Sequence, residues 1–526
     1  MHFFCIILKN LDLKNNKYNI AQPLLLSIIL AAGMLIGYNI NEKHNKPLIS
    51  GIKEENAGKT GKIEEIIRFI DAKYLYKTNQ DKFTEKALKS IFEELDPFSA
   101  YIPPSKLSSV NDKLDGNFRG IGISSYIIDD TLIVLNVLKD TPAEKAGLKP
   151  LYKIIQIGNH YITGDSINHS VIKKIISSYG EEPFDIVILD RNNRKKVVTI
   201  NAEKIENNSV SSAYMLPDST LYMKIEQFTN HTYREFMEDI EKYVVDDKIS
   251  KLIIDLRGNP GGYLQEVTKM LDQFFDKSKL DLVTTVYHDG RKDKIKSSGR
   301  NFYKISRIAV LINGHSASGS EVLAGVLQDY DRGIIVGNPS YGKGLVQEQY
   351  ELSNGGALRL TIANYYLPTG RSIQKSLDLD SNFVNTNSSH YERQDTFYSI
   401  NERRPLISGR GIYPDYFVND TMYYKLQNIL YRYDSLLFSQ AIDYIKKNKN
   451  LYNISEKDFV NSYDISLDSI PNIKDSEFSL EGIEAYKYLI KSKIAFILFG
   501  KNTEEKILNR IDPYIEEAQK HLRDIK

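Results

Sequence analysis

Between Ser209 and about Gln374 the chain alternates between strand-like and helix-like segments. Short apolar or alternating stretches such as TLYMKIEQF, KLIIDLRG, RIAVLIN and GIIVG predict strands, and ALRLTIANYYL predicts a longer one. FMEDIEKYVV, EVTKMLDQFF and SEVLAGVLQDY lie between the first four and repeat apolar residues at helical spacing. Such alternation is typical of α/β architecture. We therefore expect a mixed α/β (α+β) multidomain protein.

The rest of the 526 residues divides by texture, and a chain of this length predicts about three or four domains. Apolar residues at helical spacing predict a helical unit before the first strands, and they predict a mostly helical region at the carboxyl end. Short strands separated by turn residues fill the region between the first helices and the α/β segment. The expected parts are a helical unit at 60–115, a strand-rich domain at 116–204, a core at 205–419 with a polar insertion at 376–408, and a helical region at 420–526.

The amino-terminal segment predicts where in the cell the protein is located. Residues 21–40 contain no charge, and twenty residues in a helix match a hydrocarbon core of about 30 Å. Residues 1–19 carry three lysines against one aspartate, which predicts that this segment stays cytoplasmic. We expect a transmembrane signal anchor at 20–40 and a polar linker at 41–59. A cleaved signal peptide is the alternative, and either would export the bulk of the chain.

Charge and cysteine content exclude several classes of protein. Lysine and arginine number 69 against 68 acidic residues, so the net charge of +1 argues against a dedicated nucleic-acid binder. The single cysteine, Cys5, excludes a disulfide framework. The nine histidines show no spacing typical of metal ligands, so we expect no metal and no cofactor.

The largest cluster of candidate catalytic residues lies between Asn313 and Gln347. Small residues crowd the junction between RIAVLIN and SEVLAGVLQDY, where free backbone N–H groups and close access favour a nucleophilic serine. Ser318 is one candidate for this role. Its rival interpretation is structural, because Ser318-x-x-Glu321 is a capping-box pattern at a helix start. Ser316 and Ser320 are further candidates for a helix cap.

Lys343 has several interpretations. Gly337-x-x-x-x-Gly342-Lys343 matches most of a phosphate-binding loop, but Gly344 stands where a serine or threonine should be, and a strand-like segment follows. Ser340-x-x-Lys343 has the spacing of penicillin-binding enzymes without their other motifs. An exposed lysine on a hairpin is the plainest alternative. A Ser-His-Asp triad with His315 is weak, because no orienting acid lies nearby in sequence.

Several motifs in the right order resemble one family. SASGSE stands 25 residues ahead of the lysine in YGKGLVQ, if counted from Ser318 to Lys343. LIIDLRGNPGG, LTIANYYLPTGRSIQ and GRGIYPD flank them, Leu95-Asp96-Pro97 precedes them, and residues 116–204 resemble a PDZ domain. The chain is similar over about residues 60–420 to the carboxy-terminal processing peptidases, or tail-specific proteases. This resemblance implies a serine protease core of the ββα-spiral type with an inserted PDZ domain.

The resemblance implies roles for individual residues. Ser318 would be the nucleophile, Lys343 the general base, and Gln347 the side chain that orients the lysine. The oxyanion donors would be the backbone N–H of Gly319 and of a glycine in the turn, Gly261 or Gly262. Lysine is a base only when neutral, and about three pH units below its reference pKa this requires roughly 4–5 kcal/mol of bias. We therefore expect Lys343 in an apolar pocket without a carboxylate partner.

The PDZ-like segment implies how a substrate would be selected. The backbone of Gly120, Ile121, Gly122 and Ile123 would bind a terminal carboxylate, and the next strand would pair with the peptide. An ordinary β-turn is the alternative, and Leu151-Tyr152 depart from the family pattern.

These features together predict a serine endopeptidase of the bacterial inner membrane, single-pass, with its catalytic part in the periplasm. Its partners would be proteins or peptides with free C-terminal tails, and its C-terminal helical region would serve oligomerisation, as a homo-oligomer, or a partner contact. The alternatives are a non-catalytic PDZ adaptor on a protease-like fold and another enzyme on a related spiral, such as an acyl-CoA hydratase.

Overall fold

The computed structural model describes residues 57–162, 164, 167–247, 249–375, 396–466 and 480–524. The chain divides at Thr84 into two compact units. The described part of the first contains α3 (Ala57–Lys73) and the start of α4 (Gln80–Glu93). α4 begins at Gln80, because the side chain of Asn79 accepts a hydrogen bond from the Lys82 N–H at 3.0 Å.

The predicted anchor at 20–40 and cytoplasmic segment at 1–19 lie outside the described residues. The predicted linker at 41–59 lies mostly outside them as well, and residues 57–59 already belong to α3. No helix in the described ranges is long and apolar enough to cross a membrane.

A six-stranded sheet forms the centre of the second unit. Its order is β10-β11-β12-β15-β16-β21, with β10 antiparallel to β11 and the other neighbours parallel. The mixed α/β class predicted from the sequence is therefore confirmed. The strands are β10 (Val210–Met215), β11 (Thr220–Ile225), β12 (Lys251–Asp255), β15 (Arg307–Ile312), β16 (Ile334–Gly337) and β21 (Tyr416–Phe417).

The two faces of this sheet pack against different hydrophobic clusters. Leu252 and Ile254 of β12 pack with three helices on one face, whereas Ile253 packs with the C-terminal helix α15 on the other. Successive residues of a strand point to opposite faces, so a strand buried on both sides is apolar throughout. The helices of the first face are α8 (Thr232–Asp247), α9 (Leu264–Asp272) and α10 (Gly319–Asp329).

A second, five-stranded sheet lies beside this core. Its order is β1-β18-β13-β14, and β17 pairs with β18 as well. The strands are β1 (Ala100–Ile102), β13 (Asp281–Tyr287), β14 (Lys292–Lys296), β17 (Leu345–Glu351) and β18 (Ala357–Tyr366). Of the predicted insertion at 376–408, residues 376–395 lie outside the described part, and a hairpin of β19 (Thr396–Tyr398) and β20 (Pro405–Ile407) follows.

The region predicted as a PDZ domain contains a separate six-stranded sheet. Its order is β3-β4-β5-β7-β8, and β6 pairs with β5. The strands β2 and β9, which stand before and after this sheet in the sequence, pair with each other. Two helices, α6 (Pro142–Lys145) and α7 (His169–Ser178), accompany it. The strands are β2 (Asn117–Gly120), β3 (Ile123–Ile128), β4 (Thr131–Val137), β5 (Lys153–Ile157), β6 (His160–Tyr161), β7 (Phe184–Leu189), β8 (Lys195–Ile200) and β9 (Glu203–Glu206).

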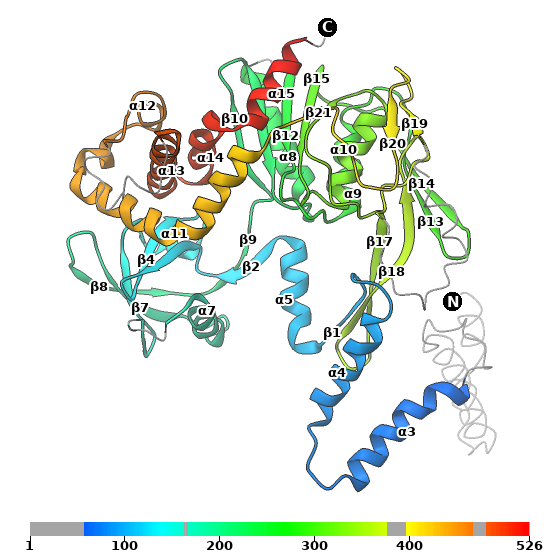
Figure 1. The fold of residues 1–526 in the computed structure, drawn as a ribbon. Helices are drawn as coiled ribbons and strands as arrows, with labels where there is room; N and C mark the ends of the chain where they lie inside the picture. Colours follow the sequence, from blue (N-terminus) through cyan, green and yellow to red (C-terminus); the bar gives the residue numbers. More distant parts are fainter. Residues whose placement is uncertain are drawn as a thin grey trace, which may run out of the picture. The chain divides into compact units, whose positions relative to one another are not determined.

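The C-terminal region packs against two sheets of its own chain. In β4, Val134 faces the cluster that contains α7, whereas Ile133 and Leu135 face the C-terminal helices. Figure 1 shows α11 and α13 along this sheet, with α14 and α15 beside the central sheet. The helices are α11 (Thr421–Lys447), η3 (Lys449–Asn453), α12 (Glu456–Asn461), α13 (Leu480–Phe499), α14 (Lys501–Leu508), η5 (Asn509–Ile511) and α15 (Pro513–Asp524). The C-terminal region, which we expected to serve oligomerisation or a partner contact, thus buries apolar residues against other parts of its own chain.

Candidate active site

Three loops that follow neighbouring parallel strands carry the predicted site residues. The turn Gly258–Gly262 follows β12, Ser318 follows β15, and Lys343 follows β16. Because β12, β15 and β16 are adjacent and parallel, their carboxyl ends meet at one edge of the sheet. Open α/β sheets bind ligands at this edge. The topology thus brings together residues that are far apart in sequence.

Ser318 stands at the N-cap of α10 in a strained backbone conformation. Its φ is 55° and its ψ is −113°, outside the regions that non-glycine residues usually adopt. Strain of this kind persists only where the surroundings enforce it, and it gathers at functional sites. The strand-to-helix turn therefore holds the Ser318 side chain where an ordinary helix start would not.

Glu321 joins the serine loop to the lysine loop. One carboxylate oxygen accepts the Ser318 N–H and the Lys343 N–H, each at 2.8 Å. The other accepts the Gly342 N–H and the Ser340 hydroxyl, each at 2.6 Å. Burial raises the pKa of Glu321, and these four hydrogen bonds act in the opposite direction. The capping pattern seen in the sequence is therefore present, and it fixes the nucleophile candidate instead of excluding it.

Lys343 lies in a pocket that disfavours its charge. Its Nζ donates to Gln347 Oε1 at 2.9 Å and lies 4.5 Å from the centre of the Phe98 ring. Burial lowers the pKa of Lys343, the cation of Arg359 lowers it further, and the carboxylates of Asp96 and Glu321 partly oppose this. Of the carboxylates in the described residues, none forms an ion pair with this amine. These surroundings match the expectation for a lysine that acts as a base.

Gln347 is itself held by the segment before β1. Its Nε2 donates to the Phe98 carbonyl at 2.6 Å, so its Oε1 faces the lysine. The side chain of Asp96 accepts the N–H groups of Phe98 and Ser99 at 2.8 and 2.7 Å. The sequence singled out Leu95-Asp96-Pro97 only as a family match. It gave no sign that the next residue, Phe98, would contact both Lys343 and Gln347.

A cavity of about 610 Å³ gathers the predicted catalytic and oxyanion residues. The cavity wall includes both loops, the glycine turn, and polar and apolar side chains from α5 (Pro104–Asp115), β17 and β18. The predicted residues that line it are Ser318, Lys343, Gln347, Gly319, Gly261 and Gly262.

The hydrogen bonds of the glycine turn distinguish between Gly261 and Gly262 as the oxyanion donor of this turn. The Gly261 N–H donates to Asn259 Oδ1 at 2.8 Å and is therefore occupied. The N–H groups of Gly262 and Gly319 have no acceptor among the described residues, and a Cβ on Gly319 would lie 3.6 Å from the Gly262 nitrogen. A Cβ on Gly261 would lie 2.7 Å from Ser318 Cβ, so only glycine fits beside the serine.

Tyr365 is a further cavity residue that the sequence did not single out. Its hydroxyl donates to the Lys343 carbonyl, and its side chain is 2 % exposed. Burial and the carboxylate of Glu321 raise the pKa of Tyr365 well above its usual range, whereas a hydrogen bond with Ser318 acts to lower it. A neutral tyrosine hydroxyl thus contacts both loops. The motif ANYYLP contained it, but a tyrosine in a half-buried strand gives no signal of its own.

The predicted peptide-binding residues lie elsewhere. Gly120 ends β2, Ile123 begins β3, and none of Gly120, Ile121, Gly122 and Ile123 lines the cavity. Ile121 is buried, and its carbonyl accepts the Ala143 N–H at 2.8 Å. Peptide binding at this segment would therefore form a site separate from the cavity.

The rival interpretations of the lysine and serine motifs lose support. Ser340 is bound to Glu321 and does not line the cavity, and His315 is exposed outside it. The strand β17 follows Lys343, so no helix N-terminus faces the loop as a phosphate site requires. The described residues contain no group of three or more His, Cys, Asp or Glu side chains that could hold a metal ion.

Comparisons with known proteins find a matching family model and several relatives of this chain. The family model described as Peptidase family S41 matches residues 219–382. A probable CtpA-like serine protease of Staphylococcus aureus (strain MRSA252) is 31% identical over 349 residues, which cover 66% of this chain and 68% of that protein. Its counterpart in Staphylococcus haemolyticus (strain JCSC1435) is 29% identical over 348 residues, with 66% and 68% covered.

Among solved structures, the photosystem II D1 C-terminal processing protease is 21% identical. The match covers 70% of this chain and 88% of that chain with a TM-score of 0.36, a score too low to support an inference about the fold.

Proposed function

Because the chain belongs to peptidase family S41, as a carboxy-terminal processing peptidase of the serine type, we propose that it cleaves proteins near their C-termini with a Ser318–Lys343 dyad. The observation that carries this proposal is the shared cavity, which gathers both residues together with Gln347 and two free backbone N–H groups. The dyad lies on loops that the fold joins through Glu321.

The chemistry follows from these surroundings. Neutral Lys343 takes the proton of the Ser318 hydroxyl as the oxygen attacks the substrate carbonyl, and the N–H groups of Gly262 and Gly319 stabilise the oxyanion. The lysine then donates this proton to the leaving amine, which gives an acyl-enzyme. The same lysine activates water for hydrolysis of the ester. Gln347 orients the amine without holding it in the charged form, because an amide oxygen accepts a hydrogen bond but carries no charge.

The substrate would be selected outside the cavity. We propose that residues 116–204 form a PDZ domain that binds the free C-terminal tail at Gly120–Ile123, and that the core is of the ββα-spiral type. The edge position of β3 supports this proposal, because an edge strand can add a peptide strand. We further propose an envelope location, with residues 20–40 as the inner-membrane anchor, the catalytic part in the periplasm, and the C-terminal helical region at 420–526 as the surface for a homo-oligomer or a partner contact.

Matched peptides test both parts of this proposal. One peptide has a free C-terminus and the other is amidated, and each is offered to the wild type, Ser318→Ala and Lys343→Ala. We expect cleavage by the wild type alone and preference for the free C-terminus. Undiminished cleavage by Lys343→Ala would exclude the dyad, and equal cleavage of both peptides would exclude carboxylate recognition. Peptide binding without cleavage by the wild type would favour the adaptor alternative.

A further inference from the structure

A buried arginine stands directly before the glycine turn of the site. Arg257 precedes Gly258–Gly262, and its side chain is 4 % exposed. Its Nε and one terminal nitrogen donate to the two oxygens of Asp255 at 2.9 and 2.6 Å, and its backbone N–H donates to the same carboxylate at 3.0 Å. Side chain and backbone of Arg257 are thus fixed together, so a shift of the guanidinium would move the start of the turn.

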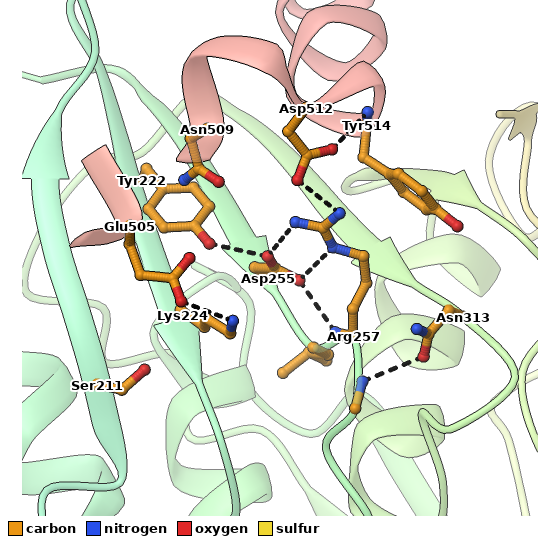
Figure 2. A network of polar contacts seen from close by, with 12 residues as sticks. Ser211, Tyr222, Lys224, Asp255, Arg257, Asn313, Glu505, Asn509, Asp512 and Tyr514 are labelled. Atoms are coloured by element: carbon orange, nitrogen blue, oxygen red, sulfur yellow. Dashed lines mark hydrogen bonds and ion pairs between the residues drawn. The ribbon is translucent and has the colours of Figure 1, made fainter. Parts of the chain in front are cut away.

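The C-terminal region completes the surroundings of this guanidinium. Asp512, just before α15, forms an ion pair with its remaining terminal nitrogen at 2.8 Å. The rings of Tyr514 and Tyr423 lie over it, with centres 4.5 and 4.9 Å from the guanidinium carbon. Figure 2 shows Asp512 reaching down from the C-terminal helices to Arg257, beside the pair of Lys224 and Glu505. Residues far outside the match to the family model therefore hold the arginine.

Asp512 is itself well oriented. Its second oxygen accepts the Tyr514 N–H at 2.9 Å, which fixes the carboxylate at the start of α15. The helix does not depend on this residue for its place, because Ile515, Ala518 and Leu522 are buried against the central sheet. Loss of the Asp512 charge would therefore change the arginine site and leave the helix docked.

The turn after Arg257 is joined tightly to the serine loop. The Gly258 N–H donates to Asn313 Oδ1 at 3.1 Å. The carbonyl of Asn259 accepts the Ala317 N–H and the Ser320 hydroxyl, each at 3.0 Å. With no room for a Cβ on Gly261, a small displacement of the turn would change the relation of Gly262 to Ser318.

We propose that Asp512 is a positioning residue for peptide hydrolysis, which acts through Arg257 on the oxyanion turn. The proposal rests on the proposed function, since it concerns the N–H group of Gly262 that would bind the oxyanion. Without Asp512, one edge of a buried guanidinium loses its partner, and the arginine turns toward water or toward other acceptors. The turn then follows, because Arg257 is fixed to it through its own backbone.

The test compares Asp512→Asn with Glu516→Gln, an acid-to-amide change at an exposed position of α15, in the full-length protein. We expect Asp512→Asn to lower kcat by about 10- to 100-fold with KM changed less than about twofold, because an oxyanion donor is displaced while peptide binding is kept. A peptide aldehyde, which forms a tetrahedral adduct, should lose affinity in parallel. Asp512→Glu should recover part of kcat, and Glu516→Gln should match the wild type.

Wild-type kcat in a folded Asp512→Asn variant would overturn the proposal, as would an equal loss in Glu516→Gln or a loss confined to KM. If Asp512→Asn does not fold, Tyr423→Leu removes one ring from the arginine instead, and a wild-type kcat there would overturn the proposal as well. Ser318→Ala in the same assay separates the two levels. Full activity of Ser318→Ala would refute the proposed function, whereas an inactive Ser318→Ala beside a fully active Asp512→Asn refutes only the role of Asp512.

Discussion

Two partly buried lysines of this protein have opposite surroundings. Lys224 on β11 forms an ion pair with Glu505 at 3.0 Å, whereas the Lys343 amine, within the part of the chain that the structure describes, donates a hydrogen bond to the neutral Gln347 alone. Burial acts to lower the pKa of Lys224, but Glu505 and Asp255 outweigh it and the pKa is raised. For Lys343, burial and Arg359 prevail and the pKa is lowered. The partner of the amine, and not burial alone, decides whether a lysine is a structural cation or a base.

The difference also separates stability from chemistry. Removing one partner of a buried ion pair strongly destabilises the folded protein, because the remaining charge is left unpaired where water cannot solvate it. A buried amine without such a partner costs free energy when charged, and this cost lowers its pKa, so that more of the amine is neutral and able to accept a proton near neutral pH. Lys224 thus belongs to the network that holds the C-terminal region, and Lys343 to the cavity.

The largest expected effect concerns the role of Lys343. Lys343→Met removes the base but preserves an apolar side chain of similar length, so we expect kcat/KM to fall by about 10³-fold or more. Lys224→Met, if it folds, should retain a much larger fraction of activity, because its amine does not line the cavity. Lys292→Ala, at an exposed position of β14, is the matched control. Retention of more than a tenth of the activity in Lys343→Met would contradict the comparison.

The same two variants should differ in stability. Lys224→Met removes the less exposed of two lysines that pair with Glu505, the other being Lys501 at 3.2 Å, and we expect a loss of about 2–3 kcal/mol in the free energy of unfolding. Lys343→Met leaves no carboxylate without an ion pair, so we expect no loss or a small gain. Urea unfolding followed by circular dichroism measures both midpoints. A larger loss for Lys343→Met than for Lys224→Met would reverse the assignment.

The dependence of these stabilities on pH should have opposite signs. With a folded-state pKa below its ordinary 10.5, Lys343 binds fewer protons than in the unfolded chain, so its contribution to stability rises as the pH rises through that window. The pKa of Lys224 is raised, so its contribution is fully present below 10.5 and is lost as the pH rises above that value. The difference between wild type and each variant, measured from pH 7 upward, reports these slopes.

The cavity could largely be predicted from sequence, whereas the Lys224 network could not. Glycines, a strand-to-helix turn and a lysine at fixed spacing are local signals. The order of the motifs resembles one family, and this resemblance predicted that they form one site. Asp512 and Glu505 meet Arg257 and Lys224 only in the folded chain, and the local sequence around each acid gives no sign of its partner. The hairpin of β13 and β14 does have a local signal, since Asp289-Gly290 is a dipeptide typical of hairpin turns, although these two strands are not among the predicted elements.

The charge near Lys343 offers a finer test. Arg359→Gln removes a cation that lowers the pKa of Lys343, so the acidic limb of kcat/KM against pH should move to higher pH, by less than about one pH unit. A neutral peptide substrate keeps other titrations out of the profile. Arg300→Gln, at an exposed position, is the control and should leave the limb in place. A move to lower pH would show that Arg359 does not act on the lysine through its charge.

The smallest effect is expected at a neutral hydrogen bond between the C-terminal region and β4 of the sheet in residues 116–204. Asn136 Nδ2 donates to the Phe496 carbonyl at 2.9 Å, and this carbonyl also accepts the Gly500 N–H at 3.0 Å. Asn136→Ala therefore leaves the acceptor satisfied, and we expect a loss of about 1 kcal/mol with kcat unchanged. A loss as large as that of Lys224→Met would mean that a neutral contact holds the helices as firmly as the buried ion pairs. The contrast between charged and neutral attachment would then fail, and packing alone would explain the docking of the C-terminal region.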